Sequence, residues 1–82
     1  MTKTELIEFI NSEGIDLSRY GIVLGSKSNT PYILGCYEEY GIWYIYEVGE
    51  RQDFGIIKSG NEEDVIKHFY LLIRGKIRAM GK

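Results

Sequence analysis

Residues 32–48 constrain the fold more than any other part of the chain, because they hold two runs of strand-forming residues around a turn. The runs 32–36 and 42–48 are rich in aromatic and β-branched residues, and Tyr40-Gly41 lies between them. Such residues favour strands, and a primed two-residue turn favours glycine at its second position. The sequence therefore predicts a β-hairpin.

The register of this hairpin decides which side chains share a face. A two-residue loop pairs Tyr37 with Tyr44, and the neighbouring pair is then Cys36 with Ile45. In that register one face carries residues suited to a core: Leu34, Cys36, Trp43 and Ile45. The other face carries Tyr37, Tyr44 and Tyr46. A three-residue loop would instead pair Tyr37 with Trp43, so the hairpin pattern alone leaves two registers open.

The two ends of the chain have helical periodicity. Thr2 and Glu5 fit a capping box, apolar residues recur at helical spacing after them, and Gly14 supplies a stop. Near the C-terminus, Asn61 is a candidate N-cap, and the three acids after it complement the helix dipole. An apolar stripe follows, made of Val65, Phe69, Leu72, Ile73, Ile77 and Met80. Gly75 interrupts this stripe, so we expect the helix to kink or end there.

Two further strands are predicted between the helices. Residues 20–24 form a short apolar run that ends in the turn-forming segment 25–31, and residues 53–58 follow a turn at Gly49. The expected fold class is α+β: a four-stranded antiparallel meander with an N-terminal and a C-terminal helix packed on one face, in the order α-β-β-β-β-α. Neither a repeat nor a linker divides the chain, so residues 1–82 are expected to form a single small domain.

Composition is typical of a folded domain. Hydrophobic residues make up 44% and charged residues 27% of the chain, outside the ranges of disordered and membrane proteins. The single cysteine, Cys36, can form no internal disulfide, and the sequence lacks both a signal-peptide pattern and an apolar run long enough to span a bilayer. We therefore expect a cytoplasmic protein that does not bind membranes and is a monomer or a weak homodimer.

Charge is distributed unevenly. Residues 1–60 carry nine acids and five bases, a net charge of −4, whereas residues 61–82 carry three acids and five bases, a net charge of +2. The acidic body would repel a phosphate backbone, so we expect no direct nucleic-acid binding. A possible second surface is the basic C-terminal end, Arg74, Lys76, Arg78 and Lys82. These bases are also explained as charges that complement the helix dipole.

Every catalytic motif in the chain is incomplete. The segment 21–28 resembles a phosphate-binding loop, but it has three residues between its glycines instead of four, and Pro31 precedes a strand rather than a helix. His68 is the only histidine, and a nucleophilic pair of Cys36 and His68 lacks a local signature. We expect a buried core thiol, a surface histidine, no metal or other cofactor and no enzymatic activity.

An acidic and aromatic segment indicates protein binding. Residues 37–53 hold five acids and five aromatic residues against one base, Arg51. Tyrosine and tryptophan are enriched at protein interfaces, and an apolar face rimmed by negative charge complements a basic partner. The alternative is that strand propensity and half-buried packing account for the tyrosines. The predicted partner-binding residues are Tyr37, Glu38, Glu39, Tyr44, Tyr46, Glu47, Glu50 and Asp53.

The same region resembles a known family. Tyr32 and Cys36 precede the run 40–49, and after a short strand residues 61–65 open a helix that contains Phe69. This pattern is similar to the small immunity proteins of bacterial polymorphic toxin systems, with immunity protein family fifty-nine the nearest. The resemblance covers about half of the chain, residues 32–73, and its hairpin and helix-start features also occur in unrelated small α+β domains.

Three positions match that family residue by residue: Trp43, Glu47 and Gly49. The chain departs from the family at Val48, where the family has an arginine, and Arg51 follows Gly49 two positions later. The resemblance implies a protein that performs no chemistry and binds a cognate toxin domain in the producing cell. Many such toxins are nucleases with basic clefts, so the tyrosines would anchor the toxin and the acids would steer it.

Two other functions fit the same residues. A general protein-interaction or regulatory module, homodimeric through a sheet edge, would use the aromatic residues without a toxin. An enzyme with an unrecognised carboxylate or cysteine site ranks last, because no motif supports it.

Overall fold

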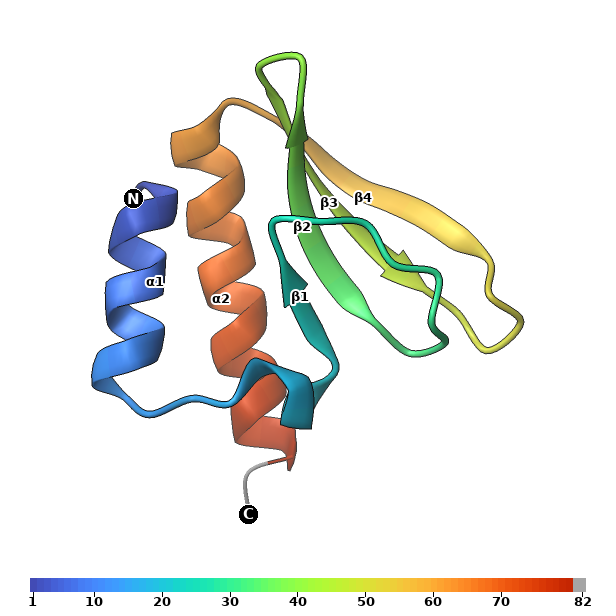
Figure 1. The fold of residues 1–82 in the computed structure, drawn as a ribbon, viewed down its shortest axis with the longest axis horizontal. Helices are drawn as coiled ribbons and strands as arrows, with labels where there is room; N and C mark the ends of the chain where they lie inside the picture. The colour runs from blue at the N-terminus through green and yellow to red at the C-terminus, as the bar shows by residue number, and fades with distance from the viewer. Residues whose placement is uncertain (81–82) are drawn as a thin grey trace.

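The computed structural model describes residues 1–80, which form two helices and an open four-stranded sheet (Figure 1). In chain order the elements are α1 (Lys3–Ser12), the 3-10 helix η1 (Leu17–Tyr20), β1 (Ile22–Leu24), β2 (Leu34–Glu39), β3 (Ile42–Val48), β4 (Phe54–Gly60) and α2 (Glu62–Met80). The fold class is therefore α+β, as predicted.

Both helices begin where the sequence signals place them. At α1 the backbone N–H of Glu5 donates to Thr2 Oγ1 (3.2 Å), and the N–H of Thr2 donates to Glu5 Oε1 (2.8 Å), which completes the capping box. At α2 the N–H of Asp64 donates to Asn61 Oδ1 (2.9 Å). We expected α2 to kink or end at Gly75, and the second alternative is wrong, since the helix continues to Met80. Residues on both sides of this glycine pack on the core and hold the helix in place.

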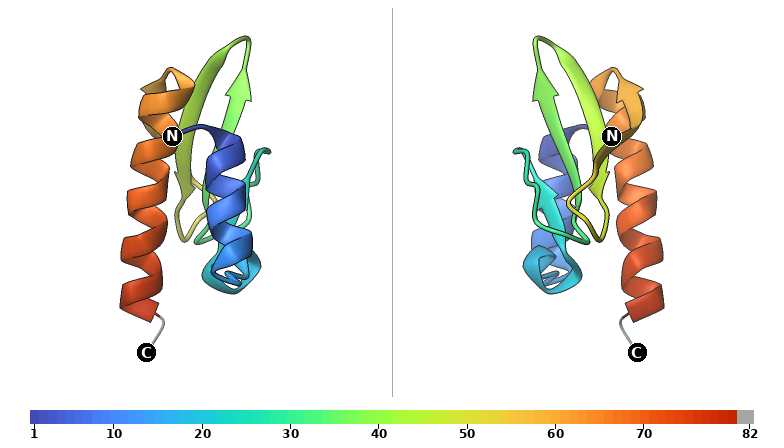
Figure 2. Two further views of the ribbon diagram at one scale, coloured as in Figure 1. Left: turned by 90° about the vertical axis from the view of Figure 1, so that its left-hand side faces the viewer. Right: turned by 90° about the vertical axis from the view of Figure 1, so that its right-hand side faces the viewer.

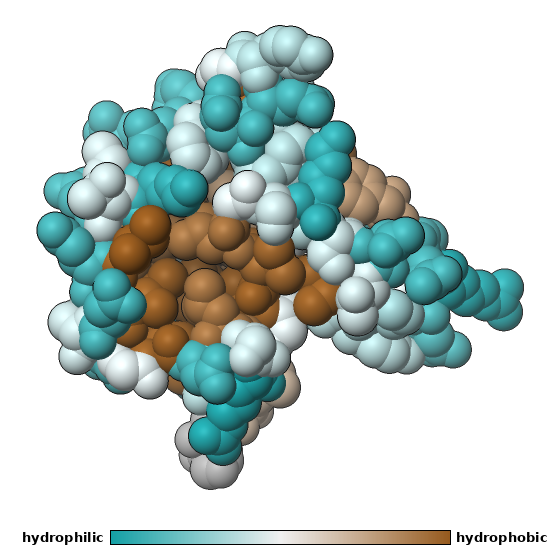
Figure 3. Space-filling model, viewed as in Figure 1, coloured by the Kyte–Doolittle hydropathy of each residue, from teal (hydrophilic) through white to brown (hydrophobic). Residues whose placement is uncertain are grey.

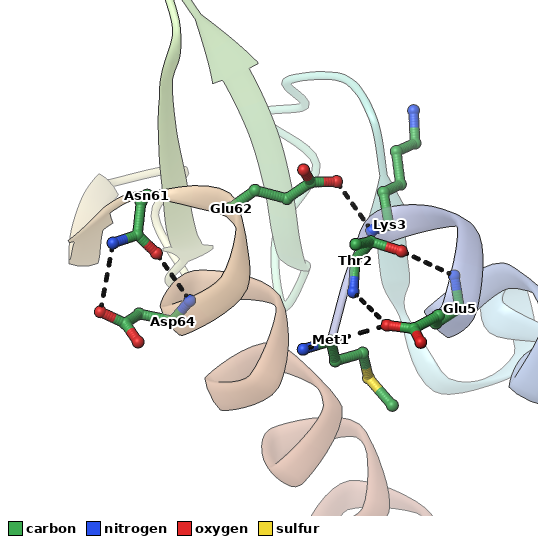
Figure 4. A network of polar contacts seen from close by, with 7 residues as sticks. All are labelled: Met1, Thr2, Lys3, Glu5, Asn61, Glu62 and Asp64. Atoms are coloured by element: carbon green, nitrogen blue, oxygen red, sulfur yellow. Dashed lines mark hydrogen bonds and ion pairs between the residues drawn. The ribbon is translucent and has the colours of Figure 1, made fainter.

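The two helices run side by side (Figure 2). Their N-terminal ends are joined by the backbone N–H of Lys3, which donates to Glu62 Oε2 at 2.9 Å (Figure 4). Further along, the rings of Phe9 and Tyr70 meet edge to face, with centroids 4.9 Å apart. A carboxylate of α2 thus satisfies one of the orphan donors in the first turn of α1.

The sheet has the order β1-β2-β3-β4, and it is mixed rather than purely antiparallel. β2, β3 and β4 form an antiparallel meander, but β1 is parallel to β2, with Ile22 beside Leu34 and Leu24 beside Cys36. The predicted antiparallel β1 is therefore wrong. The reason is the segment 25–33, which is long enough to carry the chain back so that β2 starts beside the start of β1.

Two strand boundaries also differ from the prediction of 20–24 and 53–58. Gly21 adopts a left-handed conformation (φ 67°) that closes η1, so β1 begins at Ile22. β4 runs to Gly60, and a bulge leaves Ile57 without a partner on β3.

The hairpin has the register of a two-residue loop. Tyr37 pairs with Tyr44 and Glu39 pairs with Ile42. Tyr40 and Gly41 form the turn at φ values of 54° and 82°, so both residues are left-handed, as a primed turn requires. The register that places Cys36 and Trp43 on one face and the tyrosines on the other is therefore confirmed.

Side chains from both faces of the sheet are buried. The main core joins both helices to three strands and contains Leu6, Ile10, Ile22, Leu34, Cys36, Ile45, Val65, Ile66, Phe69 and Ile73. A second, smaller cluster contains Tyr37, Tyr46 and Val48, with Ile33 and Tyr44 packed against it. We call the face that carries Tyr37, Tyr44 and Tyr46 the tyrosine face.

Candidate protein-binding surface

The tyrosine face is largely covered. Tyr46 is fully buried and Tyr37 is 8% exposed, whereas Tyr44 is half-buried. The segment 25–31 provides part of the cover: Tyr46 Oη donates to the carbonyl of Ser26 (2.8 Å), and Lys27 Nζ lies 5.0 Å from the centre of the Tyr37 ring. The prediction that Tyr37 and Tyr46 anchor a partner is therefore corrected: in this fold they are core residues.

The aromatic rings on this face stack on one another. The Tyr37 and Tyr44 ring centres are 5.1 Å apart, and Tyr46 stacks on Phe54 at 4.8 Å. Burial raises the pKa of the Tyr46 hydroxyl. Stacking and hydrogen bonding thus account for the three tyrosines of this face through packing, the alternative explanation given above for the tyrosines.

The predicted acidic residues do not form one face, because they lie at opposite ends of the sheet. Glu38 and Glu39 end β2 just before the β2–β3 turn, at the top of Figure 1, whereas the other three acids lie at or beside the β3–β4 turn, at the lower right. All five acids are exposed: Glu38, Glu39, Glu47, Glu50 and Asp53. The structure therefore replaces the single predicted surface with two separate clusters.

The first cluster is the hairpin tip, which we define as Glu38, Glu39, Tyr40 and Ile42. Tyr40 is 95% exposed, the highest value among the large hydrophobic side chains, and Ile42 is 45% exposed. Glu38 Oε2 accepts a hydrogen bond from the backbone N–H of Gly41, which ties one carboxylate to the turn. The tip therefore presents an aromatic side chain next to two acids.

The first turn of α2 adds negative charge near the hairpin tip. Gly60 pairs with Trp43, so the start of α2 follows directly from the strand end beside the hairpin. Glu63 and Asp64 are exposed there, whereas their sequence position after Asn61 predicts only that they complement the helix dipole. Their contribution could be recognised only once the register had placed the end of β4 beside the start of β3.

Few of these acids are neutralised. In residues 1–80 the ion pairs are Lys27 with Glu39 at 3.5 Å, and the N-terminal amine with Glu5 at 4.0 Å. Both pairs are exposed, where such contacts contribute little. Glu38 and Glu63 keep an uncompensated charge.

The second cluster surrounds the β3–β4 turn, and we define the turn cluster as Tyr32, Glu47, Glu50 and Asp53. Tyr32 is 66% exposed and, like Tyr40, has a positive φ (65°). The turn cluster borders a hollow of about 430 Å³ that Lys76 also lines. With Arg51 in the same turn and Lys76 beside it, the turn cluster has a net charge of −1. The hairpin tip, taken with Lys27 and with Glu63 and Asp64 of α2, has a net charge of −3.

Cys36 and His68 do not form a nucleophilic pair. Cys36 is fully buried, and burial raises the pKa of its thiol to about 12, so the thiol stays protonated and unreactive at neutral pH. His68 is exposed on α2. The expected core thiol and surface histidine are both confirmed.

A groove of about 460 Å³ lies between the end of α1, η1 and α2. Arg19, Arg74 and Arg78 line it together with Glu13 and Asp16. Hydrogen bonds from the side chain and backbone of the neighbouring serine lower the pKa of Asp16, so this carboxylate is a poor proton donor near neutral pH. Lys82, the last base of the predicted basic end, lies outside the described residues.

Residues 1–80 contain neither a cluster of side chains suited to a metal ion nor a helix suited to crossing a membrane. Three or more His, Cys, Asp and Glu side chains nowhere come together in that range in a way that could hold a metal ion. Neither described helix combines the length and apolar character needed to cross a membrane.

Comparisons with protein-family models, with curated proteins and with solved structures find no match to this chain.

Proposed function

We propose that this protein acts by binding another protein through its hairpin tip, without catalysis, and that it is an immunity protein that neutralises a bacterial toxin in the cytoplasm of the producing cell. The toxin would present a basic surface, as a nuclease cleft does, to the acids of the hairpin tip and of the first turn of α2. This proposal keeps the partner expected from the sequence but moves the contact from the tyrosine face to the tip.

The observation that carries the proposal is the conformation of Tyr40. A left-handed backbone is unfavourable for a bulky residue, and Asn, Asp or Gly is the usual choice at this position of a primed turn. Tyr40 is nevertheless left-handed and almost fully exposed. A strained, exposed aromatic side chain contributes little to the fold, whereas large aromatic side chains are common binding anchors.

Charge favours the hairpin tip over the turn cluster. The tip lies near the acids of the first turn of α2, while Arg51 and Lys76 partly offset the acids of the turn cluster. Complementary charge across an interface mainly speeds association and selects partners. A basic toxin would therefore approach the tip first.

The sharpest test exchanges Tyr40 for the residue that the turn prefers. We expect Tyr40→Asn to raise the free energy of unfolding by about 0.5–1 kcal/mol, because it relieves backbone strain, and to abolish binding to the partner. Tyr32→Asn is the matched control, since Tyr32 is also exposed and left-handed. It should raise stability similarly and leave binding intact.

The readout is bacterial growth when the chain is co-expressed with the C-terminal domain of the large protein encoded immediately upstream. Rescue by the wild-type chain and by Tyr32→Asn, but not by Tyr40→Asn, supports the proposal. Rescue lost only with Tyr32→Asn would move the interface to the turn cluster. If the neighbouring domain is harmless, or kills regardless of this chain, the immunity function is wrong and a general interaction module becomes the better explanation.

A further inference from the structure

β1 has one free edge. It pairs only with β2, through bonds such as that from the N–H of Leu34 to the carbonyl of Gly21 (2.9 Å) and that from the N–H of Gly25 to the carbonyl of Cys36 (2.7 Å). Backbone groups along a strand alternate in direction from one residue to the next. Gly21 and Gly25 bond to β2, so their neighbours within β1, Ile22 and Leu24, direct their N–H and C=O groups away from β2. These groups are available to another strand.

One side of α1 faces this edge. Lys3 Nζ lies 3.4 Å from where a Cβ atom on Gly25 would be, so the Lys3 side of α1 is turned toward the end of β1. Ile7 lies one turn further along the same side and is 39% exposed. Figure 3 shows hydrophobic side chains gathered between α1 and β1. An apolar patch therefore lies directly beside unpaired backbone groups.

A basic side chain lies at one end of β1. Lys3 approaches the Gly25 end. Lys3 takes part in no ion pair within residues 1–80. The edge thus combines free backbone donors and acceptors, apolar surface, and positive charge at the Gly25 end.

We propose that β1 receives an extended segment of a partner protein as a fifth strand, and that this segment alternates apolar with polar side chains and carries acids at the end that lies beside Lys3. Its backbone would bond to Ile22 and Leu24, and its apolar side chains would cover the patch beside Ile7. The acids of the segment would meet Lys3.

A single extended segment fits this edge better than a second copy of the chain. If two β1 strands paired around a two-fold axis, the axis would keep both copies of α1 on the same side of the joined sheet. Both helices would then lie over the junction between the two β1 strands. β1 is also only three residues long. The proposal stands on residues away from the hairpin tip and is independent of the toxin-binding function.

The test uses a synthetic peptide of alternating valine and threonine with two glutamates at each end, and NMR-detected amide exchange on the full chain. We expect the peptide to slow exchange of the Ile22 and Leu24 amides by about tenfold or more, because free edge donors become hydrogen-bonded. Unchanged exchange at both amides, or protection confined to β4, would overturn the proposal.

Two variants separate backbone pairing from side-chain contact. Leu24→Pro removes a backbone N–H that does not bond to β2, and we expect this variant to weaken peptide binding by about tenfold. Leu24→Ala keeps the N–H and should weaken peptide binding less. Equal losses in the two variants would contradict strand addition. If Leu24→Pro does not fold, Lys3→Glu is the deciding variant. It should weaken binding of the glutamate-ended peptide and strengthen binding of a lysine-ended peptide. No change in either affinity would refute the charge requirement.

Discussion

Gly35 and Tyr46 are matched across β2 and β3. A Cβ atom at Gly35 would lie impossibly close to the Tyr46 ring, so the tyrosine occupies the space that a side chain on β2 would need. The ring covers the glycine backbone, and its hydroxyl reaches the carbonyl of Ser26. This pair anchors the segment 25–31 to the sheet.

We therefore expect Gly35→Ala to lower the free energy of unfolding by about 2 kcal/mol or more, because the methyl group overpacks the site and displaces the ring. Gly55→Ala is the control, since Gly55 also lies in a strand and has open space around it. Its stability should stay close to wild type or rise slightly, because alanine costs less backbone entropy than glycine. Urea denaturation measures both, and equal effects would show that the Tyr46 contact is unimportant.

The Cys36 thiol gives stability a pH dependence in the alkaline range. Burial raises its folded-state pKa from the ordinary value of 9.0 to about 12, so the folded chain keeps a proton that the unfolded chain releases. The contribution is complete below pH 9 and is lost as the pH rises from 9 toward 12. We expect the urea midpoint to fall over this range, and to fall less steeply in Cys36→Ala, which retains Tyr46. Parallel pH profiles would show that another group is responsible.

At the scale of elements, α2 carries a glycine that its packing does not require. Nothing lies within 4 Å of a Cβ atom added at Gly75, and the helix passes through this residue. Gly75→Ala should raise the free energy of unfolding by about 1 kcal/mol, because alanine is the better helix former. Gly14→Ala has equally open space but a left-handed backbone (φ 65°), so it should destabilise. Thermal unfolding of both variants tests whether the sign of the stability change follows the backbone φ of the glycine.

Locally encoded elements could be predicted, and the position of β1 could not. The hairpin register follows from Tyr40-Gly41 and the alternation beside it, and the starts of α1 and α2 follow from capping residues a few positions away. The direction of β1 depends on the path of the segment 25–33, which is fixed by distant contacts. Tyr46 bonds to Ser26, and the N–H of Tyr32 donates to the carbonyl of Val48.

At the scale of the whole molecule, exposed acids gather at the end of the sheet that carries the hairpin tip and leads from β4 into α2. Replacing Glu38 and Glu63 by lysine should slow association with a basic partner by about tenfold and flatten its dependence on salt, because exposed charges mainly steer the encounter. The matched control carries two lysines in place of Glu47 and Glu50, in the turn cluster. Stopped-flow association at several ionic strengths distinguishes them, and equal slowing would show that net charge matters rather than position.

The composition of the candidate surface was predicted better than its shape. The acids and an aromatic anchor were expected between residues 37 and 53, and exposed acids do occur there. Strand alternation assigned Tyr37 and Tyr46 to the correct face, but it could not show that the chain would fold back over that face. The predicted partner-binding residues leave out Tyr40, although a tyrosine where Asn or Gly is usual was a signal available in the sequence.

The bulge in β4 limits how this sheet can grow. Phe54, Ile56 and Ile57 are each more than 40% exposed on an outer strand, the kind of edge from which fibrils extend. Ile56 and Ser59 lie opposite Tyr46 and Tyr44, so they share a face although they are three residues apart. In a straight incoming strand, every second residue lies on the same face. Such a strand can therefore match the alternation of faces in β4 on only one side of Ile57. Geometry rather than charge would thus protect this edge, and concentrated solutions of the protein should stay free of ordered polymer.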